Sequence, residues 1–173
     1  MKIKISKNED INEIKYLMSL AIDVLQHGYL TPDQIEASHA GMGLDTQLIE
    51  DGTYFCVWTD GRIVGCGGWS FRSTLYGGNH TAGRDAARLN PAKDRARIRA
   101  MYTHPDFTRR GVGRMILEAS EDAARAAGFK ACEMAATLAG EPFYRRCGYV
   151  VENRWQDENG AVPVPLLTMT KTL

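Results

Sequence analysis

The most constraining feature of the chain is a strand, a turn and a helix that follow one another between residues 97 and 126. Residues 97–103, RIRAMYT, read as a strand, and Pro105 closes it. The helix begins at Gly111 and carries one apolar face, formed by Val112, Met115, Ile116, Ala119, Ala123 and Ala126. Gly111 and Gly113 let backbone N–H groups approach an anion at the helix amino terminus, where the helix dipole is positive. We therefore expect a phosphate-binding site there.

The amino-terminal segments predict a short strand and two helices. Residues 2–5 alternate like a strand, and apolar residues recur at helical spacing over 11–25 until Gly28 ends that helix. Thr31 then provides a helix cap, with proline at the first helical position and Gln34 completing a capping box. A second, short helix is expected from this point.

A hairpin is predicted around Asp60-Gly61. Both residues tolerate positive φ, and they separate the strand-like segments 53–59 and 62–71. An antiparallel pair of strands therefore comes before the strand at 97–103.

The carboxyl-terminal part predicts further alternation of strand and helix. Gly128 ends the helix that begins at Gly111, and Glu121 is expected to pair with Arg125 on the helix surface. The remaining elements are predicted as a strand at 129–136, a short helix at 140–147, and strands at 149–155 and 162–171. No internal repeat or linker is visible, so the 173 residues are predicted to form a single domain.

Composition and charge limit the classes of binding partner that we expect for this chain. Lysine plus arginine and aspartate plus glutamate both total 21, so charge gives no reason to expect nucleic acid or an anionic membrane as partner. No apolar run approaches the ~18 residues of a membrane span. The first ten residues, MKIKISKNED, lack the apolar stretch of a secretory signal, so a cytoplasmic location is expected. The cysteines and histidines show no metal-ligand spacing, so no metal is expected.

Other phosphate-binding motifs fit poorly. The dinucleotide fingerprint requires a third glycine, whereas Gly113 is followed by Arg114, Met115 and Ile116. The phosphate loop that ends in GK[ST] is absent. A nicotinamide or nucleotide enzyme is therefore the weaker reading.

The segment from Thr108 to Gly113, TRRGVG, resembles the phosphate motif [QR]-x-x-G-x-[GA] of the GNAT superfamily of acetyl-CoA-dependent N-acetyltransferases, except for Thr108 at the first position. The resemblance extends over nearly the whole chain. It implies an α/β fold with a mixed, mostly antiparallel twisted sheet and helices on both faces. It also implies that acetyl-CoA is the co-substrate and that a small-molecule or peptide amine is the acceptor, attacking the thioester directly. The domain would be a monomer or a homodimer.

The resemblance also implies site residues. The backbone amides of Arg109, Arg110, Gly111, Val112, Gly113 and Arg114 would hold the pyrophosphate, and the backbones of Tyr102 and Thr103 would pair with pantetheine like an added strand. Many members have an asparagine where this chain has Thr137, which offers only a hydroxyl to the same arm.

The catalytic acid implied by the family is Tyr144, in the segment 140–149, GEPFYRRCGY. In the family this phenol lies near the coenzyme sulfur and protonates the departing thiolate. The general base is open: the strand at 97–103 has no carboxylate, so Glu133, His104 and a bound water are the alternatives. A non-catalytic acyl-CoA sensor or scaffold domain is the rival function on the same fold.

The segment 72–96 predicts a long loop with marginal helix at 84–89. Because it enters the strand expected to hold pantetheine, we expect it to form a lid or wall over the acceptor site. Its donors for an acceptor anion are Arg72, His80, Arg84 and Arg88. Trp69 and Phe71, just before it, are alternative pocket walls.

Overall fold

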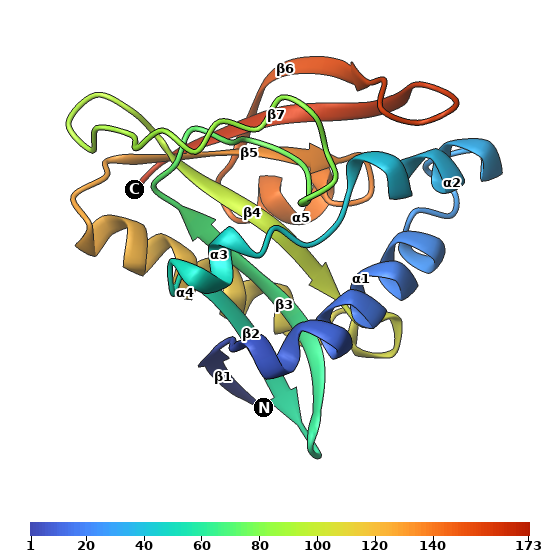
Figure 1. Cartoon of the computed structure of the whole chain (residues 1–173), viewed down its shortest axis with the longest axis horizontal. Helices are drawn as coiled ribbons and strands as arrows, with labels where there is room; N and C mark the ends of the chain where they lie inside the picture. The colour runs from blue at the N-terminus through green and yellow to red at the C-terminus, as the bar shows by residue number, and fades with distance from the viewer.

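The computed structural model describes all 173 residues. A seven-stranded sheet runs through the molecule in the order β1-β2-β3-β4-β5-β7-β6 (Figure 1). Only the pair β4 and β5 is parallel. The strands are β1 (Lys2–Ile5), β2 (Tyr54–Thr59), β3 (Arg62–Ser70), β4 (Ala96–Thr103), β5 (Ala131–Thr137), β6 (Val150–Asp157) and β7 (Val164–Thr172). The predicted mixed, mostly antiparallel sheet is confirmed.

Five α-helices accompany the sheet: α1 (Ile11–Leu25), α2 (Pro32–Gly41), α3 (Gln47–Glu50), α4 (Val112–Ala126) and α5 (Glu141–Arg146). Short 3-10 helices cover Asn8–Asp10 and Pro105–Phe107. The four-residue helix α3 has no counterpart in the sequence-based prediction, because one turn is too short to show a helical period.

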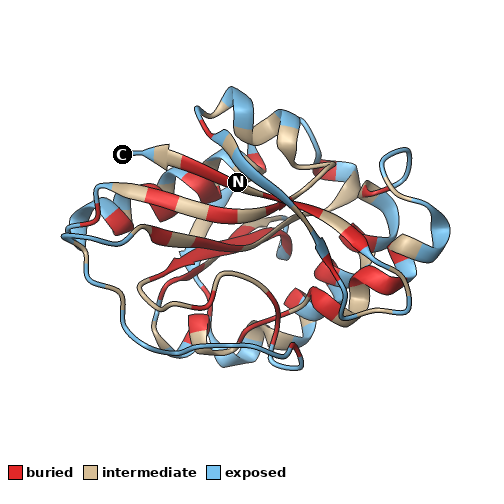
Figure 2. Ribbon diagram, turned by 90° about the horizontal axis from the view of Figure 1, so that it is seen from above, coloured by how far each residue is buried: buried red, intermediate tan, exposed pale blue.

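Helices cover both faces of the sheet. Successive strand residues point to opposite sides, so Cys56 packs in a cluster with α1, whereas Val57 packs in a cluster with α4. Figure 1 shows the two helices on opposite sides of the strands, and Figure 2 shows the buried residues concentrated along the strands and the inward helix faces. The core is therefore divided by the sheet into two layers.

Local signals set several element boundaries as predicted. The Thr31 hydroxyl accepts a hydrogen bond from the backbone N–H of Gln34, and the Thr31 N–H donates to the side-chain Oε1 of Gln34, so the capping box at the start of α2 is complete. Asp60 and Gly61 have φ values of 49° and 77°, which are the left-handed conformations that a tight hairpin turn between β2 and β3 requires.

The predicted apolar face of α4 is correct only in part, because Val112 and Ile116 are buried as predicted but other buried positions differ. Its buried side chains are Val112, Ile116, Leu117, Ser120, Glu121 and Ala124, so the stripe that faces the sheet is rotated from the predicted one, and Ala126 is exposed. Glu121 is therefore buried and bonds Lys171 of β7 at 2.7 Å, while Arg125 pairs with Asp122 at 2.6 Å. The rest of the prediction failed because alanine is compatible with either face, and because the partner of Glu121 comes from a strand distant in sequence.

The segment between β3 and β4 contains no helix, contrary to the marginal helix expected at 84–89. An isolated bridge joins Arg72 to Arg88, and a short turn follows before β4 begins at Ala96. The segment lies as an extended loop against one end of the sheet (Figure 1).

Candidate active site

The two central strands separate from each other along their length. β4 pairs with β5 only at Ala96↔Cys132 and Arg97↔Glu133, and no pairing continues beyond Arg97. Ala100, further along β4, has a φ of 49°, a conformation rare for a residue with a side chain. The edge of β4 that faces β5 therefore has no strand partner over its second half. Two adjoining cavities open there.

The larger cavity, called the large cleft below, has a volume of about 630 Å³ and lies between the end of β4, the start of α4, and α5, with α1 across from them. Nine of the ten residues predicted for the site line it: Tyr102, Thr103, Arg109, Gly111, Val112, Gly113, Arg114, Thr137 and Tyr144. The fold thus brings residues from three separate segments of the sequence to one cleft.

The amino terminus of α4 opens into the large cleft. Arg109 and Gly111 both have positive φ, at 64° and 86°, and Gly111 is the N-cap residue. No side chain caps this helix, and its first turn carries no acidic residue. The free N–H groups and the positive end of the dipole therefore face the cleft, which suits the phosphates of a coenzyme.

Gly113 has a packing role as well. A Cβ at this position would lie 3.3 Å from the ring of Phe143, which lines the same cleft from α5. Glycine thus allows α5 to approach the first turn of α4. This close approach brings Tyr144, the next residue in α5, toward the carboxyl-terminal end of β4.

The side chain of Arg110 lies apart from the other predicted residues. Its guanidinium stacks over Phe107 at 4.9 Å, as does that of Arg62, and Arg110 is absent from the cleft lining. A role in coenzyme binding would thus rest on its backbone amide alone.

Arg146 is a cleft residue that the sequence analysis missed. It lies on the last turn of α5, lines the large cleft, and its side chain makes no hydrogen bond or ion pair within the protein. The adjacent Arg145 instead bonds Glu141 at 2.9 Å. The pair of arginines next to Tyr144 was the signal that could have indicated it.

Tyr144 lies where the two cavities meet, since it lines both. Its ring packs against Phe143 and Tyr149, with centroids 5.1 Å and 6.0 Å away. Burial raises the pKa of Tyr144 above its ordinary value, and Cys147 adds to the rise. The phenol therefore keeps its proton over the whole physiological range, as a proton donor must.

Thr137 ends β5 beside Tyr144. Its hydroxyl accepts a hydrogen bond from the Gly140 N–H at 3.1 Å and thus closes the turn that leads into α5. The hydroxyl proton is free to be donated toward the cleft.

Neither predicted base side chain reaches the cavities. Glu133 is held in ion pairs by Arg97 and, at 3.2 Å, by Arg95. His104 accepts from the Asp106 N–H at 3.2 Å. Neither residue, and no other aspartate, glutamate or histidine, lines either cavity. Neither side chain is therefore placed to take a proton from a substrate in these cavities.

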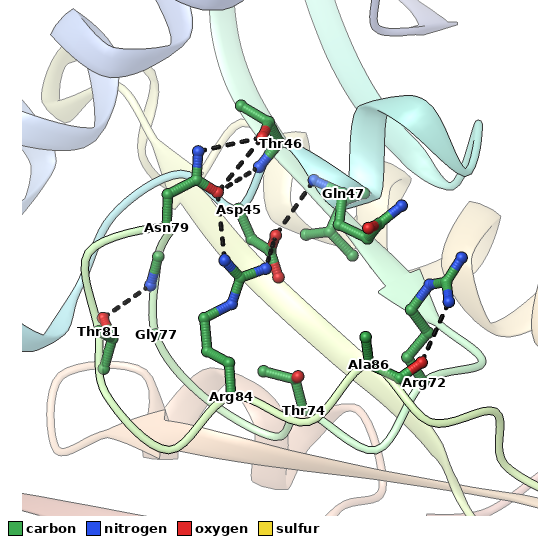
Figure 3. A network of polar contacts seen from close by, with 12 residues as sticks. Asp45, Thr46, Gln47, Arg72, Thr74, Gly77, Asn79, Thr81, Arg84 and Ala86 are labelled. Carbon is green, nitrogen blue, oxygen red and sulfur yellow. Dashed lines mark hydrogen bonds and ion pairs between the residues drawn. The ribbon is translucent and has the colours of Figure 1, made fainter.

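The loop 72–96 contributes to the smaller cavity through Leu75, Tyr76 and Gly77. Its predicted anion donors point elsewhere. Arg84 pairs with Asp45 (Figure 3), and Arg72 pairs with Asp51 at 2.7 Å. Arg88 stacks on Phe71, and His80 contacts the His39 carbonyl. These side chains fasten the loop to the protein.

Trp69 and Phe71 do not line either cavity. Trp69 is 6% exposed and packs edge-on against Phe129 in the core, with ring centroids 6.0 Å apart. The expectation that they wall a pocket is wrong, because β3 points Trp69 into the α4 layer.

The structure shows neither a metal-binding cluster nor a membrane-spanning helix. The structure contains no group of three or more His, Cys, Asp or Glu side chains placed to hold a metal ion. None of its helices is both long and apolar enough to cross a membrane.

Comparison with known proteins identifies the family. The model of the acetyltransferase (GNAT) family matches residues 15–149. No curated protein gives a significant sequence match. Similar solved structures include a GCN5-related N-acetyltransferase from Rhodopseudomonas palustris, with a TM-score of 0.74 and 20% identity over 99% of this chain and 95% of that one.

Two further similar structures were solved with the coenzyme. PaiA N-acetyltransferase from Thermoplasma acidophilum, in complex with coenzyme A, has a TM-score of 0.67 and 14% identity over 99% of this chain and 98% of that one. YncA, a putative acetyltransferase from Salmonella typhimurium with acetyl-CoA, has a TM-score of 0.63 and 16% identity over 100% of this chain and 94% of that one. At such identities these likenesses show the fold, and the family model extends over most of the sequence. The chain therefore belongs to the GNAT acetyltransferase family.

Proposed function

We propose that the chain, residues 1–173, acts as one N-acetyltransferase domain that transfers the acetyl group of acetyl-CoA to a primary amine. The observation that carries the proposal is a coincidence in space. The uncapped amino terminus of α4, the unpaired edge of β4 and the phenol of Tyr144 all face the large cleft. Acetyl-CoA matches these three features, because it has anionic phosphates, an extended arm with amide groups, and a thioester.

The phosphates would bind at the start of α4, where the backbone amides from Arg109 to Arg114 point outward. Arg109, Arg114 and Arg146 line the same part of the cleft and would add positive charge. The amide groups of the pantetheine arm would pair with the free edge of β4 at Tyr102 and Thr103, as an added strand does.

In the transfer, a bond forms between the acceptor nitrogen and the acetyl carbon, and the carbon–sulfur bond of the thioester breaks. The sulfur leaves as a thiolate, and Tyr144 would give it a proton. The nitrogen, which becomes positively charged on attack, releases a proton to water to give the amide, and Tyr144 regains a proton from solvent. Because the chain holds both substrates beside each other, positioning supplies much of the rate.

The amine must lose its proton before it attacks. No carboxylate or imidazole lines either cavity, so the proton would leave through water. Burial in an apolar cavity itself favours the neutral amine over the ammonium.

The test has two parts. Calorimetry should show that purified protein binds coenzyme A, and a thiol-release assay with acetyl-CoA and a panel of amines should show transfer. A protein that binds acetyl-CoA but releases no thiol with any amine would be a sensor or scaffold domain. A protein that does not bind coenzyme A would refute the proposal.

A further inference from the structure

The smaller cavity, called the small cavity below, lies beyond Tyr144 where β4 and β5 diverge. It has a volume of about 80 Å³ and shares five lining residues with the large cleft: Met42, Met101, Tyr102, Thr137 and Tyr144. The two spaces are therefore adjacent. A thioester placed along β4 with its sulfur near Tyr144 would present its carbonyl carbon to the small cavity.

Most residues that line the small cavity are of hydrophobic type, although three of them are tyrosines with polar hydroxyls. Twelve of its 16 residues are hydrophobic, among them Leu75, Ile98, Met101, Met134 and Leu166. Its one charged residue is Arg99. A ligand group that fills this space would therefore meet aliphatic side chains and neutral hydroxyl groups, and a charged group there would lose its hydration without finding a free counter-ion.

The Arg99 guanidinium is already bonded to groups of the protein. This group, 2% exposed, donates to the Thr74 carbonyl at 2.8 Å, the Gly77 carbonyl at 2.7 Å and the Asp45 carboxylate at 3.2 Å. Burial lowers the pKa of Arg99, against the opposing effect of Asp45. The three acceptors replace the water that the guanidinium has lost, and Asp45 is a counter-ion that Arg99 shares with Arg84.

The same contacts position one wall of the small cavity. The two carbonyls that Arg99 holds belong to residues 74 and 77, so they bracket Leu75 and Tyr76. Tyr76 is held at its other end, because its hydroxyl donates to Asp157 at 3.0 Å and its ring packs on Trp155 with centroids 5.7 Å apart. Figure 3 shows Arg84 reaching Asp45 from the same loop. Contacts to Arg99 of β4 and to Asp157 and Trp155 of β6 therefore hold this wall in place.

We propose that the small cavity selects acceptor amines whose other substituent is small, apolar and uncharged. The inference rests on the proposed acetyl transfer and names its substrate class. An apolar cavity of about 150 Å³ holds a benzene molecule. By proportion, this cavity suits roughly three or four non-hydrogen atoms, the size of a short alkyl group. Amines that carry a carboxylate or a second ammonium would place an uncompensated charge there.

Matched pairs of amines test this class. Isobutylamine and valine differ only by a carboxylate, and butylamine and 1,4-diaminobutane differ only by a terminal ammonium. In the thiol-release assay, the uncharged member of each pair should give a kcat/KM at least about tenfold higher, the cost of one poorly compensated polar group. Calorimetry on the protein saturated with coenzyme A should show the same order of binding.

Two arginine substitutions on the loop sharpen the test. Leu75→Arg places a cation in the small cavity and should reduce the preference for isobutylamine over valine to less than about threefold. Ala82→Arg adds the same charge to the same loop at an exposed position and should leave the preference unchanged. Leu75→Ala, which only enlarges the cavity, should shift the preference toward longer alkylamines.

The outcomes separate this proposal from the function on which it rests. If coenzyme A does not bind, the acetyltransferase proposal fails. If coenzyme A binds but valine or 1,4-diaminobutane is used or bound as well as its partner, the acceptor class is wrong. If no alkylamine binds and butyryl-CoA is hydrolysed faster than acetyl-CoA, the cavity holds the acyl chain, and the acceptor class is again wrong.

Discussion

Arg99 on β4 and Asp45, just before α3, form an ion pair inside the protein. Their Nη2 and Oδ2 atoms are 3.2 Å apart, and their side chains are 2% and 3% exposed. Asp45 also forms an ion pair with Arg84 of the loop between β3 and β4. One carboxylate therefore joins the central strand to the loop that walls the small cavity.

Asp45→Ala should lower the free energy of unfolding by about 3–5 kcal/mol, because it leaves the Arg99 guanidinium buried without its counter-ion. Urea denaturation measures the change. Asp23→Ala, which removes the partner of a far more exposed His39 pair, should cost less than about 1 kcal/mol. Equal effects from the two substitutions would contradict a structural role for the buried pair.

Gly113→Glu should abolish coenzyme A binding. The new carboxylate would stand at the amino terminus of α4, where it occupies the anion site and repels phosphate, and its Cβ would crowd Phe143. Calorimetry measures the binding. Ala126→Glu adds the same group at the exposed far end of α4, and this variant should still bind coenzyme A. A folded Gly113→Glu protein with unchanged affinity would place the phosphates elsewhere.

Tyr144→Phe should lower kcat by about 10²-fold and change the affinity for coenzyme A less than about twofold, since the hydroxyl would act only as the thiolate leaves. Turnover at saturating acetyl-CoA is the measurement. Tyr16→Phe, on a side chain that is 69% exposed, serves as the control. Unchanged turnover in the Tyr144 variant would leave its phenol with a packing role only.

Arg146→Gln should weaken coenzyme A binding about three- to tenfold, the range for one exposed charge-assisted contact. The adjacent Arg145→Gln is a matched control, because Arg145 is paired with Glu141 and does not line the cleft. Calorimetry at low and high salt should show that only the Arg146 effect shrinks with added salt. Equal losses from both substitutions would indicate a general charge effect.

Stability should fall in alkaline solution from about pH 9 upward. Burial raises the pKa of Cys66 and Cys132 from 9.0 to about 12. Between these values the unfolded chain has released protons that the folded protein retains, so each thiol lowers the free energy of unfolding by up to about 1.4 kcal/mol per pH unit. Urea denaturation from pH 8 to 11 measures the slope, and Cys132→Ala should reduce it. A slope that is the same in both proteins would contradict this assignment.

The sequence alone determined the elements whose signals are local. The capping box at Thr31 and the turn at Asp60-Gly61 involve residues within three positions of each other, so their geometry follows from the residues themselves. The glycine turn before α4 is of the same kind. These signals, with the hydrophobic periods, were sufficient for the order of the strands and of every α-helix except α3, and for the family resemblance.

The tertiary structure alone decided which residues share the site. The separation of β4 from β5 after Arg97 depends on pairing between strands that are over thirty residues apart, and no local pattern records it. The same holds for Glu133, whose carboxylate is held by two arginines, and for Arg99, whose bonds to residues 74 and 77 form a cavity wall. The preference of a segment for helix, strand or turn depends on the residues within that segment. Which residues a side chain contacts depends instead on the packing of the whole fold, which leaves few buried charges unpaired.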